Sequence, residues 1–417
     1  MNAEIIAVGS ELLTPDRLDT NSLFLTGRLN MLGIRVSRKA IVGDQPGDIR
    51  DAFSEALHRA EIVISTGGLG PTLDDQTREA VSGLLGLALK LDQETLQHIR
   101  ERFERMSRAM PEINVRQAMV PEGAEILPNP RGTAPGLWLE TRGRFIILLP
   151  GPPNEMEGIF EQEVVRRLAR HSPGTRLVKR EIRVTGMGES HLEELIAPIY
   201  TSYPNVETTI LAGQGEIQIH PRMWSADAEA ARQTLDELTG KIEVALGEHI
   251  FSTDGESFEK VVAAALVANH ATIATAESCT GGLVAERLTR VPGSSAYFIS
   301  GVVCYSNEAK TALAGVPGEV IAAHGAVSSE VAIRLAEGIR RRSGATLGIG
   351  ITGIAGPDGG APEKPVGTVH IALAAENKTR ESRFVFPGDR ERVCWQASQV
   401  ALDWVRRHFP PGLRGAN

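Results

Sequence analysis

The chain has 417 residues, which is too long for one ordinary domain and predicts two or three domains. Its hydrophobic fraction of 42% and its charged fraction of 23% are typical of a soluble globular protein. The net charge of −8 argues against broad nonspecific binding of nucleic acid. The three cysteines form no C-x-x-C pair, which argues against a disulfide framework and against a thiolate zinc site.

The first residues of the chain, 1–13, lack a basic region and a long apolar core, so we expect no signal peptide. No run of about eighteen apolar residues follows, and we expect no membrane span. The few scattered cysteines favour a reducing compartment. We therefore expect a cytoplasmic protein.

Residues 1–172 alternate short apolar runs with helical patterns. Thr20 or Asn21 is the expected cap of the first helix. Alternation of strand and helix predicts a parallel, doubly wound α/β sheet for this domain. Strands are predicted at residues 3–9, 61–68 and 144–153, and helices at residues 20–34, 74–86 and 154–171.

Residues 173–252 show a different pattern, which is that of a small α+β domain. A boundary is expected near Ser252 or Asp254, close to the start of the next helix. Half-buried strands are predicted at residues 179–186 and 215–224, and helices at residues 190–203 and 227–247.

Residues 253–417 form a second α/β domain in this prediction. It begins with a helix at residues 257–270, whose apolar residues fall on one face. The predicted fold is therefore of the α/β class, with two parallel-sheet α/β domains joined by a small α+β domain. Strands of the last domain are predicted at residues 271–276, 297–306, 346–353, 367–375 and 382–386.

Four loops of the last domain follow predicted strands, at residues 277–282, 305–310, 352–360 and 386–393. Ligands collect at the carboxyl ends of strands in a parallel α/β sheet, so we expect these loops to form a site. The glycine-rich third loop lets backbone N–H groups approach an anion closely, although alone it is also compatible with a simple turn. Candidate substrate-binding residues in the first and third loops are Thr280, Gly281, Thr352, Gly353 and Gly356.

Ser278, in the first loop, has two interpretations, a helix cap and a nucleophile. A serine nucleophile needs a base, and no histidine falls in the four loops; the nearest in sequence are His324 and His370. Lys310 is the better candidate base, because a lysine in a partly dry pocket loses some preference for its charged form. Tyr305 would orient it or relay a proton. The alternatives are an exposed helix lysine and a strand-end aromatic residue.

Arg390 stands just ahead of the last predicted helix, at a position where phosphate is favoured. Taken alone, this residue has the pattern of a surface arginine. Taken together, the four loops predict a phosphate-bearing substrate beside a pair formed by Ser278 and Lys310.

The motifs of these loops resemble a known family. "TAESCTGG", "YSNEAK", "HGAVS", "GIAGPDGG", "KPVGTV" and "GDR", over residues 256–410, resemble the C-terminal domain of competence/damage-inducible CinA proteins, which is the same as stand-alone nicotinamide mononucleotide amidohydrolases. The resemblance implies deamidation of nicotinamide mononucleotide to nicotinate mononucleotide, with no cofactor. It places catalysis on Ser278, Tyr305 and Lys310 and substrate binding on Arg390. Ser295 also matches a motif position.

The strongest motif of the first domain is "VISTGGLGPTLDDQTREA", a strand followed by a loop that contains Gly67, Gly68 and Gly70. The loop suits a phosphate or pyrophosphate. Thr72 is the expected cap of a helix that begins with two acids, which suit a hard cation such as magnesium or simply favour the helix dipole. The candidate metal ligands are Asp74 and Asp75, with Glu11 and Asp44 at other strand ends.

The first domain also resembles the molybdopterin-binding fold, and more closely the N-terminal domain of CinA proteins. The cofactor enzymes have the motif T-G-G-T-G, and Leu69 replaces its second threonine here. This change favours the CinA branch over a molybdopterin binder. The CinA resemblance implies a metal-dependent ADP-ribose pyrophosphatase. The middle domain resembles the family's KH-like linking domain, but it has no G-x-x-G loop with basic flanks, so RNA binding is not implied.

Three hypotheses follow for the whole chain. The first is a two-activity enzyme of pyridine-nucleotide salvage whose partners are small nucleotides, nicotinamide mononucleotide and ADP-ribose. The second is a non-enzymatic partner protein in DNA uptake or damage response, and the third is a molybdopterin binder. The acidic balance and the Ser278, Tyr305 and Lys310 set favour the enzyme. A homodimer is expected from the resemblance alone.

Overall fold

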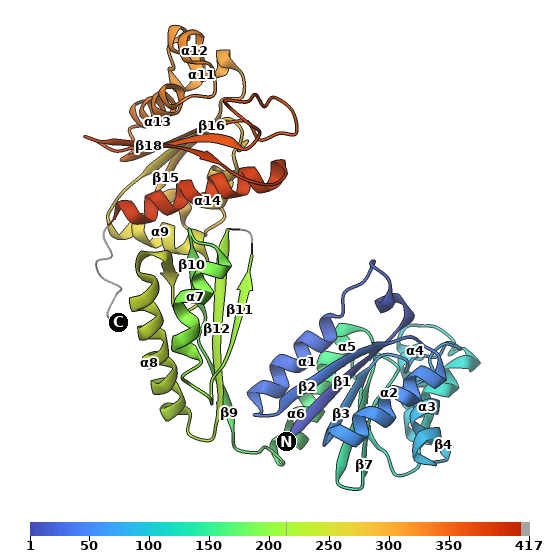
Figure 1. Cartoon of the computed structure of the whole chain (residues 1–417). Coiled ribbons are helices and arrows are strands. Elements are labelled where there is room, and N and C mark those ends of the chain that lie inside the picture. Colours follow the sequence, from blue (N-terminus) through green and yellow to red (C-terminus); the bar gives the residue numbers. More distant parts are fainter. Residues whose placement is uncertain (214, 410–417) are drawn as a thin grey trace. The chain divides into compact units, whose positions relative to one another are not determined.

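The computed structural model describes residues 1–213 and 215–409 (Figure 1). The chain divides into two compact units, residues 1–178 with 224–231, and residues 179–223 with the remainder of the chain from 232. No helix in the described residues is both long and apolar enough to cross a membrane.

The first unit contains a six-stranded sheet in the order β2-β1-β3-β8-β7-β6. The first four strands of this order pair in parallel, as predicted. Strand β7 runs antiparallel to both of its neighbours, β8 and β6. Arg142 and Gly143, both with positive φ, form the tight turn that returns β7 onto β8. The strands are β1 (Asn2–Val8), β2 (Arg35–Val42), β3 (Ile62–Thr66), β6 (Glu125–Leu127), β7 (Gly136–Thr141) and β8 (Arg144–Leu149).

Helices cover both faces of this sheet. Alternate residues of β1 enter different cores: Ile5 packs with Leu25 and Phe160 on one face, and Ile6 packs with Phe53 on the other. The doubly wound α/β class is therefore confirmed. The helical segments are η1 (Ser10–Leu13), α1 (Thr20–Met31), α2 (Pro46–Arg59), α3 (Thr77–Leu85), α4 (Gln93–Arg105), η2 (Glu112–Ala118), α5 (Pro153–Ile159), the π-helix η3 (Phe160–Val164) and α6 (Val165–Ala169); a small pair of strands is β4 (Leu89–Leu91) and β5 (Met119–Pro121).

Two predicted helix starts in the first unit are wrong. The side chain of Asp19 accepts a hydrogen bond from the Ser22 N–H and caps α1, in place of Thr20 or Asn21. Helix α3 begins at Thr77, so Asp74 and Asp75 lie in the turn before it and not in its first turn.

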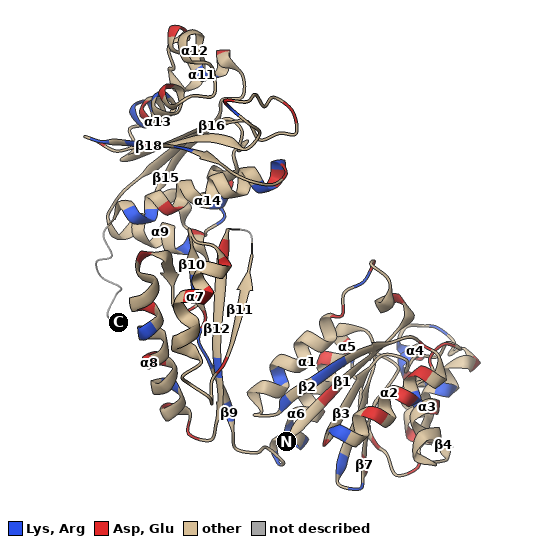
Figure 2. Cartoon of the chain, viewed as in Figure 1, with Lys and Arg blue, Asp and Glu red and all other residues tan. Residues whose placement is uncertain are grey.

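The second unit begins with a small antiparallel sheet in the order β11-β12-β10-β13, which confirms an α+β domain. Figure 2 shows acidic and basic residues interspersed along α8, where Lys241 pairs with Glu237. This α+β domain, of which residues 176–178 and 224–231 are counted in the first unit, contains β9 (Arg176–Lys179), β10 (Ile182–Thr185), α7 (Glu189–Tyr200), β11 (Glu207–Ala212), β12 (Glu216–Ser225), α8 (Ala228–Leu246), η4 (Gly247–His249) and β13 (Ile250–Ser252).

The last domain contains a five-stranded sheet in the order β15-β14-β16-β17-β18. Strands β14, β15 and β16 are parallel, whereas β17 runs antiparallel to both of its neighbours. Strand β18 therefore runs in the same direction as β16, and its carboxyl end lies at the same edge as those of β14, β15 and β16. The strands are β14 (Ile273–Glu277), β15 (Phe298–Val303), β16 (Leu347–Gly353), β17 (Thr368–Ala374) and β18 (Thr379–Val385).

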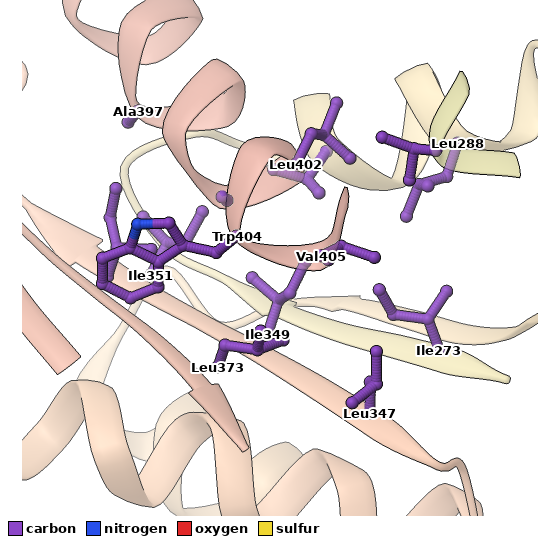
Figure 3. Close-up of a cluster of buried hydrophobic side chains, with 14 of the residues drawn as sticks. Ile273, Leu288, Leu347, Ile349, Ile351, Leu373, Ala397, Leu402, Trp404 and Val405 are labelled. Atoms are coloured by element: carbon purple, nitrogen blue, oxygen red, sulfur yellow. The ribbon is translucent and has the colours of Figure 1, made fainter. Parts of the chain in front are cut away.

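Helices again cover both faces. Figure 3 shows Trp404 and Val405 of α14 packed against Ile349 and Leu373 of the sheet. On the other face, α13 lies so close to β16 that a Cβ on Gly348 or Gly350 would stand 2.2 or 2.3 Å from a helix carbonyl oxygen. The helical segments are α9 (Phe258–Ala268), α10 (Leu283–Thr289), η5 (Ser294–Ala296), α11 (Asn307–Ala314), α12 (Gly318–His324), α13 (Ser329–Ser343) and α14 (Arg390–His408).

Helix α9 begins at Phe258, shortly after the expected boundary near Ser252 and Asp254. Ser257 caps α9, since its hydroxyl accepts a hydrogen bond from the Lys260 N–H. Ser252 instead donates a hydrogen bond to Asp254 in the preceding turn.

Candidate functional site

A cavity of about 470 Å³ opens at the carboxyl edge of the last sheet. The four predicted loops contribute to it, because β18 returns to the direction of β14, β15 and β16. The cavity is lined by Ser278, Cys279, Tyr305, Ser306, Asn307, Lys310, Ala326, Val327, Thr352, Gly353, Ile354, Ala355, Gly356, Asp358, Gly359 and Arg390.

The turn that carries Ser278 is organised by the preceding residue. Glu277 ends β14 fully buried, and its carboxylate accepts hydrogen bonds from the Thr280 hydroxyl at 2.7 Å and from the N–H groups of Gly282, Val284 and Ala285 at 2.9–3.1 Å. Glu277 therefore caps α10, a role that sequence reasoning offered to Ser278. No side chain or backbone group among the described residues is hydrogen-bonded to the Ser278 hydroxyl oxygen, and this nearly buried residue lines the cavity.

Lys310 lies in α11 and is only 2% exposed. Burial lowers the pKa of its ammonium group from the ordinary value, because the charged form loses its hydration. Its Nζ donates to the backbone carbonyl of Tyr305 at 3.3 Å, and no carboxylate of the described residues forms an ion pair with it. The interpretation of Lys310 as an exposed helix lysine is therefore wrong, and its setting suits a base.

Tyr305 contacts a different partner from the one predicted. Its side chain is 61% exposed, and its phenolic oxygen accepts a hydrogen bond of 2.5 Å from Arg390. A second nitrogen of Arg390 donates to the Gly356 carbonyl oxygen at 2.9 Å. The Tyr305 side chain thus orients Arg390, and only its backbone contacts Lys310.

Three predicted residues do not line the cavity. The Thr280 hydroxyl is engaged by Glu277, and Gly281 is exposed. Ser295 is also exposed and lies in η5, which immediately precedes β15. The amino end of β15 faces the opposite edge of the sheet from the cavity, so the chain path itself keeps Ser295 away from Ser278.

Cys279 is the other potential nucleophile in the cavity. Burial raises the pKa of its thiol to about 12, so the thiolate is scarce at neutral pH. Its carbonyl oxygen accepts a hydrogen bond from the Cys394 thiol at 3.1 Å. These features leave Ser278 as the better nucleophile.

A second cavity, of about 910 Å³, lies at the carboxyl edge of the first sheet and includes the glycine loop after β3. The backbone carbonyl oxygens of this loop accept hydrogen bonds from two buried residues, Thr77 and Arg78. Thr77 donates its hydroxyl to the Gly67 oxygen and its N–H to the Gly68 oxygen, and Arg78 donates to the oxygens of Leu69 and Gly70. No acceptor among the described residues takes a hydrogen bond from the N–H of Gly68 or Leu69, a pattern that suits an anion.

The four predicted metal ligands line this cavity but differ in availability. Both carboxylate oxygens of Asp75 accept hydrogen bonds from its own loop, at Gly70 and Thr72, and Asp44 accepts from the Ser10 N–H. Asp74 is exposed, and the nearby Thr72 side chain lowers the pKa of its carboxyl group. The described residues contain no cluster of three or more potential metal-binding side chains.

Three family profiles match the chain. The profile described as "CinA C-terminal domain" matches residues 255–409, "Probable molybdopterin binding domain" matches residues 4–170, and "Damage-inducible protein CinA KH domain" matches residues 179–252. A CinA-like protein of Koribacter versatilis is 50% identical over 411 residues, which cover 98% of this chain and 99% of that protein. The chain belongs to the CinA family.

Other proteins are also similar to this chain. A CinA-like protein of Solibacter usitatus is 49% identical over 409 residues, with 98% of each chain covered. Among solved structures, the protein CinA with unknown function from Thermoplasma acidophilum is 34% identical and covers 40% of this chain and 97% of its own, with a TM-score of 0.38.

Two buried charged residues beside the cavities were not predicted from the sequence. Glu277 directly precedes the candidate nucleophile, and its position at a strand end was the available signal. Arg78 is 2% exposed behind the glycine loop, and burial lowers the pKa of its guanidinium. Nothing in the local sequence marks Arg78, because the carbonyls it binds become neighbours only when the loop closes.

Proposed function

We propose that residues 253–417 hydrolyse the carboxamide of nicotinamide mononucleotide to give nicotinate mononucleotide and ammonia. One observation carries the proposal: the Ser278 hydroxyl and the buried Lys310 amine line one cavity with Arg390. The serine is the nucleophile, the lysine is the base, and the arginine holds the substrate's phosphate.

In the first half of the reaction, neutral Lys310 takes the hydroxyl proton as the Ser278 oxygen bonds to the carboxamide carbon. The C–N bond then breaks, and Lys310 gives this proton to the departing nitrogen, which leaves as ammonia. In the second half, water attacks the ester, Lys310 takes a water proton, and that proton returns to the serine oxygen. Backbone N–H groups of the turn after β14 would stabilise the oxyanion.

The test uses nicotinamide mononucleotide with a ¹⁵N-labelled carboxamide and the purified full chain. We expect labelled ammonia in equal amount to nicotinate mononucleotide, with and without EDTA, because no step uses a metal. A chain that binds the nucleotide but releases no ammonia would favour the second hypothesis, a non-enzymatic partner protein in DNA uptake or damage response.

We further propose that residues 1–172 cleave the pyrophosphate of ADP-ribose. Support comes from the glycine loop, whose carbonyl oxygens accept hydrogen bonds from Thr77 and Arg78, and from the exposed Asp74 in the same cavity. Carboxylate oxygens fit magnesium, which commonly uses one or two carboxylates and completes its shell with substrate phosphates and water. Asp74 would hold such a cation with Glu11 or Asp44, and the cation would offset charge on the leaving phosphate.

A molybdopterin binder is the weaker alternative for the first domain. Leu69 is 1% exposed and packs in the apolar core, so the loop has no hydroxyl at the position of the cofactor enzymes' second threonine. A shift in the thermal midpoint with ADP-ribose and magnesium, and none with molybdopterin, would separate the two. We also propose a cytoplasmic location and a homodimer; light scattering of the purified chain tests the dimer.

A further inference from the structure

Two segments of the last domain carry sequence motifs, and the proposed reaction assigns no role to any of their side chains. The first, residues 324–328, joins α12 to α13 and reads "HGAVS". The second, residues 354–367, joins β16 to β17, and the motif "KPVGTV" spans its end and the first two residues of β17. Both contribute to the cavity that contains Ser278.

One side chain joins these two segments. The Nζ of Lys364, in the second segment, donates to the Val327 carbonyl oxygen at 2.7 Å and to the His324 carbonyl oxygen at 3.4 Å. No carboxylate of the described residues forms an ion pair with Lys364, so its charge is directed only at backbone oxygens. Hydrogen bonds from a charged donor are shorter and stronger than neutral ones.

The backbone at Lys364 is itself held in place. Its backbone N–H and carbonyl pair with those of Ala361 at 3.0 and 2.9 Å, which closes a tight turn. Arg383 of β18 donates to the Glu363 carbonyl oxygen at 2.6 Å. The lysine therefore extends from a turn that is anchored to the sheet.

The segment that Lys364 holds forms a wall of the cavity. Ala326 and Val327 line the cavity, and the Thr352 hydroxyl donates to the Ala326 carbonyl oxygen at 2.7 Å. This wall presents small apolar side chains, whereas Ser278, Lys310 and Arg390 come from other loops. Its contribution to binding is therefore the width of the cavity and not charge.

We propose that Lys364 is a positioning residue, which clamps residues 324–328 against residues 354–367 and so sets the cavity width that a flat pyridine ring requires. The inference rests on the proposed deamidation. Without Lys364, residues 324–328 keep the hydrogen bond from Thr352 but lose both bonds from the lysine, so the wall is more mobile. The substrate is then bound less tightly before the reaction and in the transition state alike. The expected result is a higher KM with little change in kcat.

The experiment compares Lys364→Met, Lys364→Arg and a matched control, Lys378→Met, in the full chain. Lys378 is exposed in the turn between β17 and β18 of the same domain. Amide hydrogen exchange is measured over peptides spanning 320–330 and 354–367, and KM and kcat are measured for nicotinamide mononucleotide and nicotinamide riboside.

For Lys364→Met we expect exchange in both peptides to rise about tenfold, with other peptides unchanged, because a local opening becomes easier. KM should rise roughly tenfold for both substrates with kcat within about twofold, and Lys364→Arg should recover part of the loss. Unchanged exchange would overturn the clamp, and raised exchange with unchanged KM would overturn its role in binding. A loss confined to the phosphate-bearing substrate would show that Lys364 acts through charge, which also overturns the proposal.

Exchange does not depend on catalysis. If the wild-type chain releases no ammonia, the deamidation proposal and the positioning role fail together, while the exchange data still decide whether Lys364 holds the two segments.

Discussion

The guanidinium of Arg390 donates a hydrogen bond of 2.5 Å to the phenolic oxygen of Tyr305. These residues come from the amino end of α14 and the carboxyl end of β15, so the bond joins two of the four loops around the cavity. The same bond raises the pKa of Arg390 and orients its guanidinium beside Gly356.

Tyr305→Phe removes this bond and leaves the bond between Lys310 and the Tyr305 backbone carbonyl in place. We expect KM for nicotinamide mononucleotide to rise about three- to tenfold, since a hydrogen bond from the charged guanidinium to a phenol this exposed to water contributes about 0.5–1.5 kcal/mol. Steady-state kinetics check this. A loss of kcat as large as that of Ser278→Ala would show that the phenol itself takes part in the chemistry.

The pH dependence of deamidation follows from Lys310. Its pKa is lowered by burial from the ordinary value of 10.5, and only the neutral amine accepts the serine proton. We expect kcat/KM to rise with pH up to an apparent pKa below 10.5, and we expect Lys310→Arg to be as inactive as Lys310→Met, because arginine stays charged. An active arginine variant would show that the reaction needs only a positive charge.

The same shift predicts a change in stability. Between the lowered folded pKa of Lys310 and 10.5, the unfolded chain binds more protons than the folded chain, so the free energy of unfolding should rise with pH in this window. Lys310→Met should weaken that rise. Urea unfolding of both proteins at several pH values in the window measures the difference, and identical pH slopes would contradict it.

Glu277→Gln should destabilise the last domain. The amide has one acceptor oxygen where the carboxylate has two, so some of the four donors at the start of α10 lose their partner, at a cost of about 1–3 kcal/mol. Glu286→Gln, on the exposed side of α10, is the matched control and should change stability by no more than about 0.5 kcal/mol. Equal thermal midpoints for the two variants would contradict the capping role of Glu277.

Asp74 and Asp75 should respond differently to substitution by Asn. Asp74→Asn should reduce magnesium-dependent cleavage of ADP-ribose with little effect on stability, because its carboxylate is exposed. Asp75→Asn should lower the thermal midpoint, because its carboxylate accepts hydrogen bonds from Gly70 and Thr72. Deamidation should survive both changes, and its loss with either variant would contradict two separate sites.

Much of the site could be predicted because the ends of strands can be recognised in the sequence. The loops that carry Ser278, Lys310 and Arg390 each follow an apolar run, and parallel strands bring such ends to one edge. The antiparallel direction of β17 was not predicted, since strand direction depends on pairing with distant residues. The prediction for the loop before Arg390 still holds, because β18 reverses direction a second time.

Other features depend on contacts that no local pattern encodes. The pattern at Thr72 and Asp74 favours a helix start, but hydrogen bonds from Gly70 and Thr72 hold the Asp75 carboxylate in a turn and delay α3 to Thr77. Ser295 matches a motif position, and its surrounding sequence carries no other signal. Its position at the amino end of β15 emerges only from the direction of the strand.

The most direct test of the central claim is to look for the acyl-enzyme on Ser278. The full chain is mixed with nicotinamide mononucleotide, quenched in acid during turnover and digested, and the peptide that contains residues 274–287 is examined by mass spectrometry. We expect the mass of this peptide to increase by that of the nicotinate mononucleotide acyl group, with fragmentation assigning it to Ser278, and we expect no adduct and no ammonia from Ser278→Ala. Ammonia release by Ser278→Ala at a near-normal rate would contradict the serine mechanism.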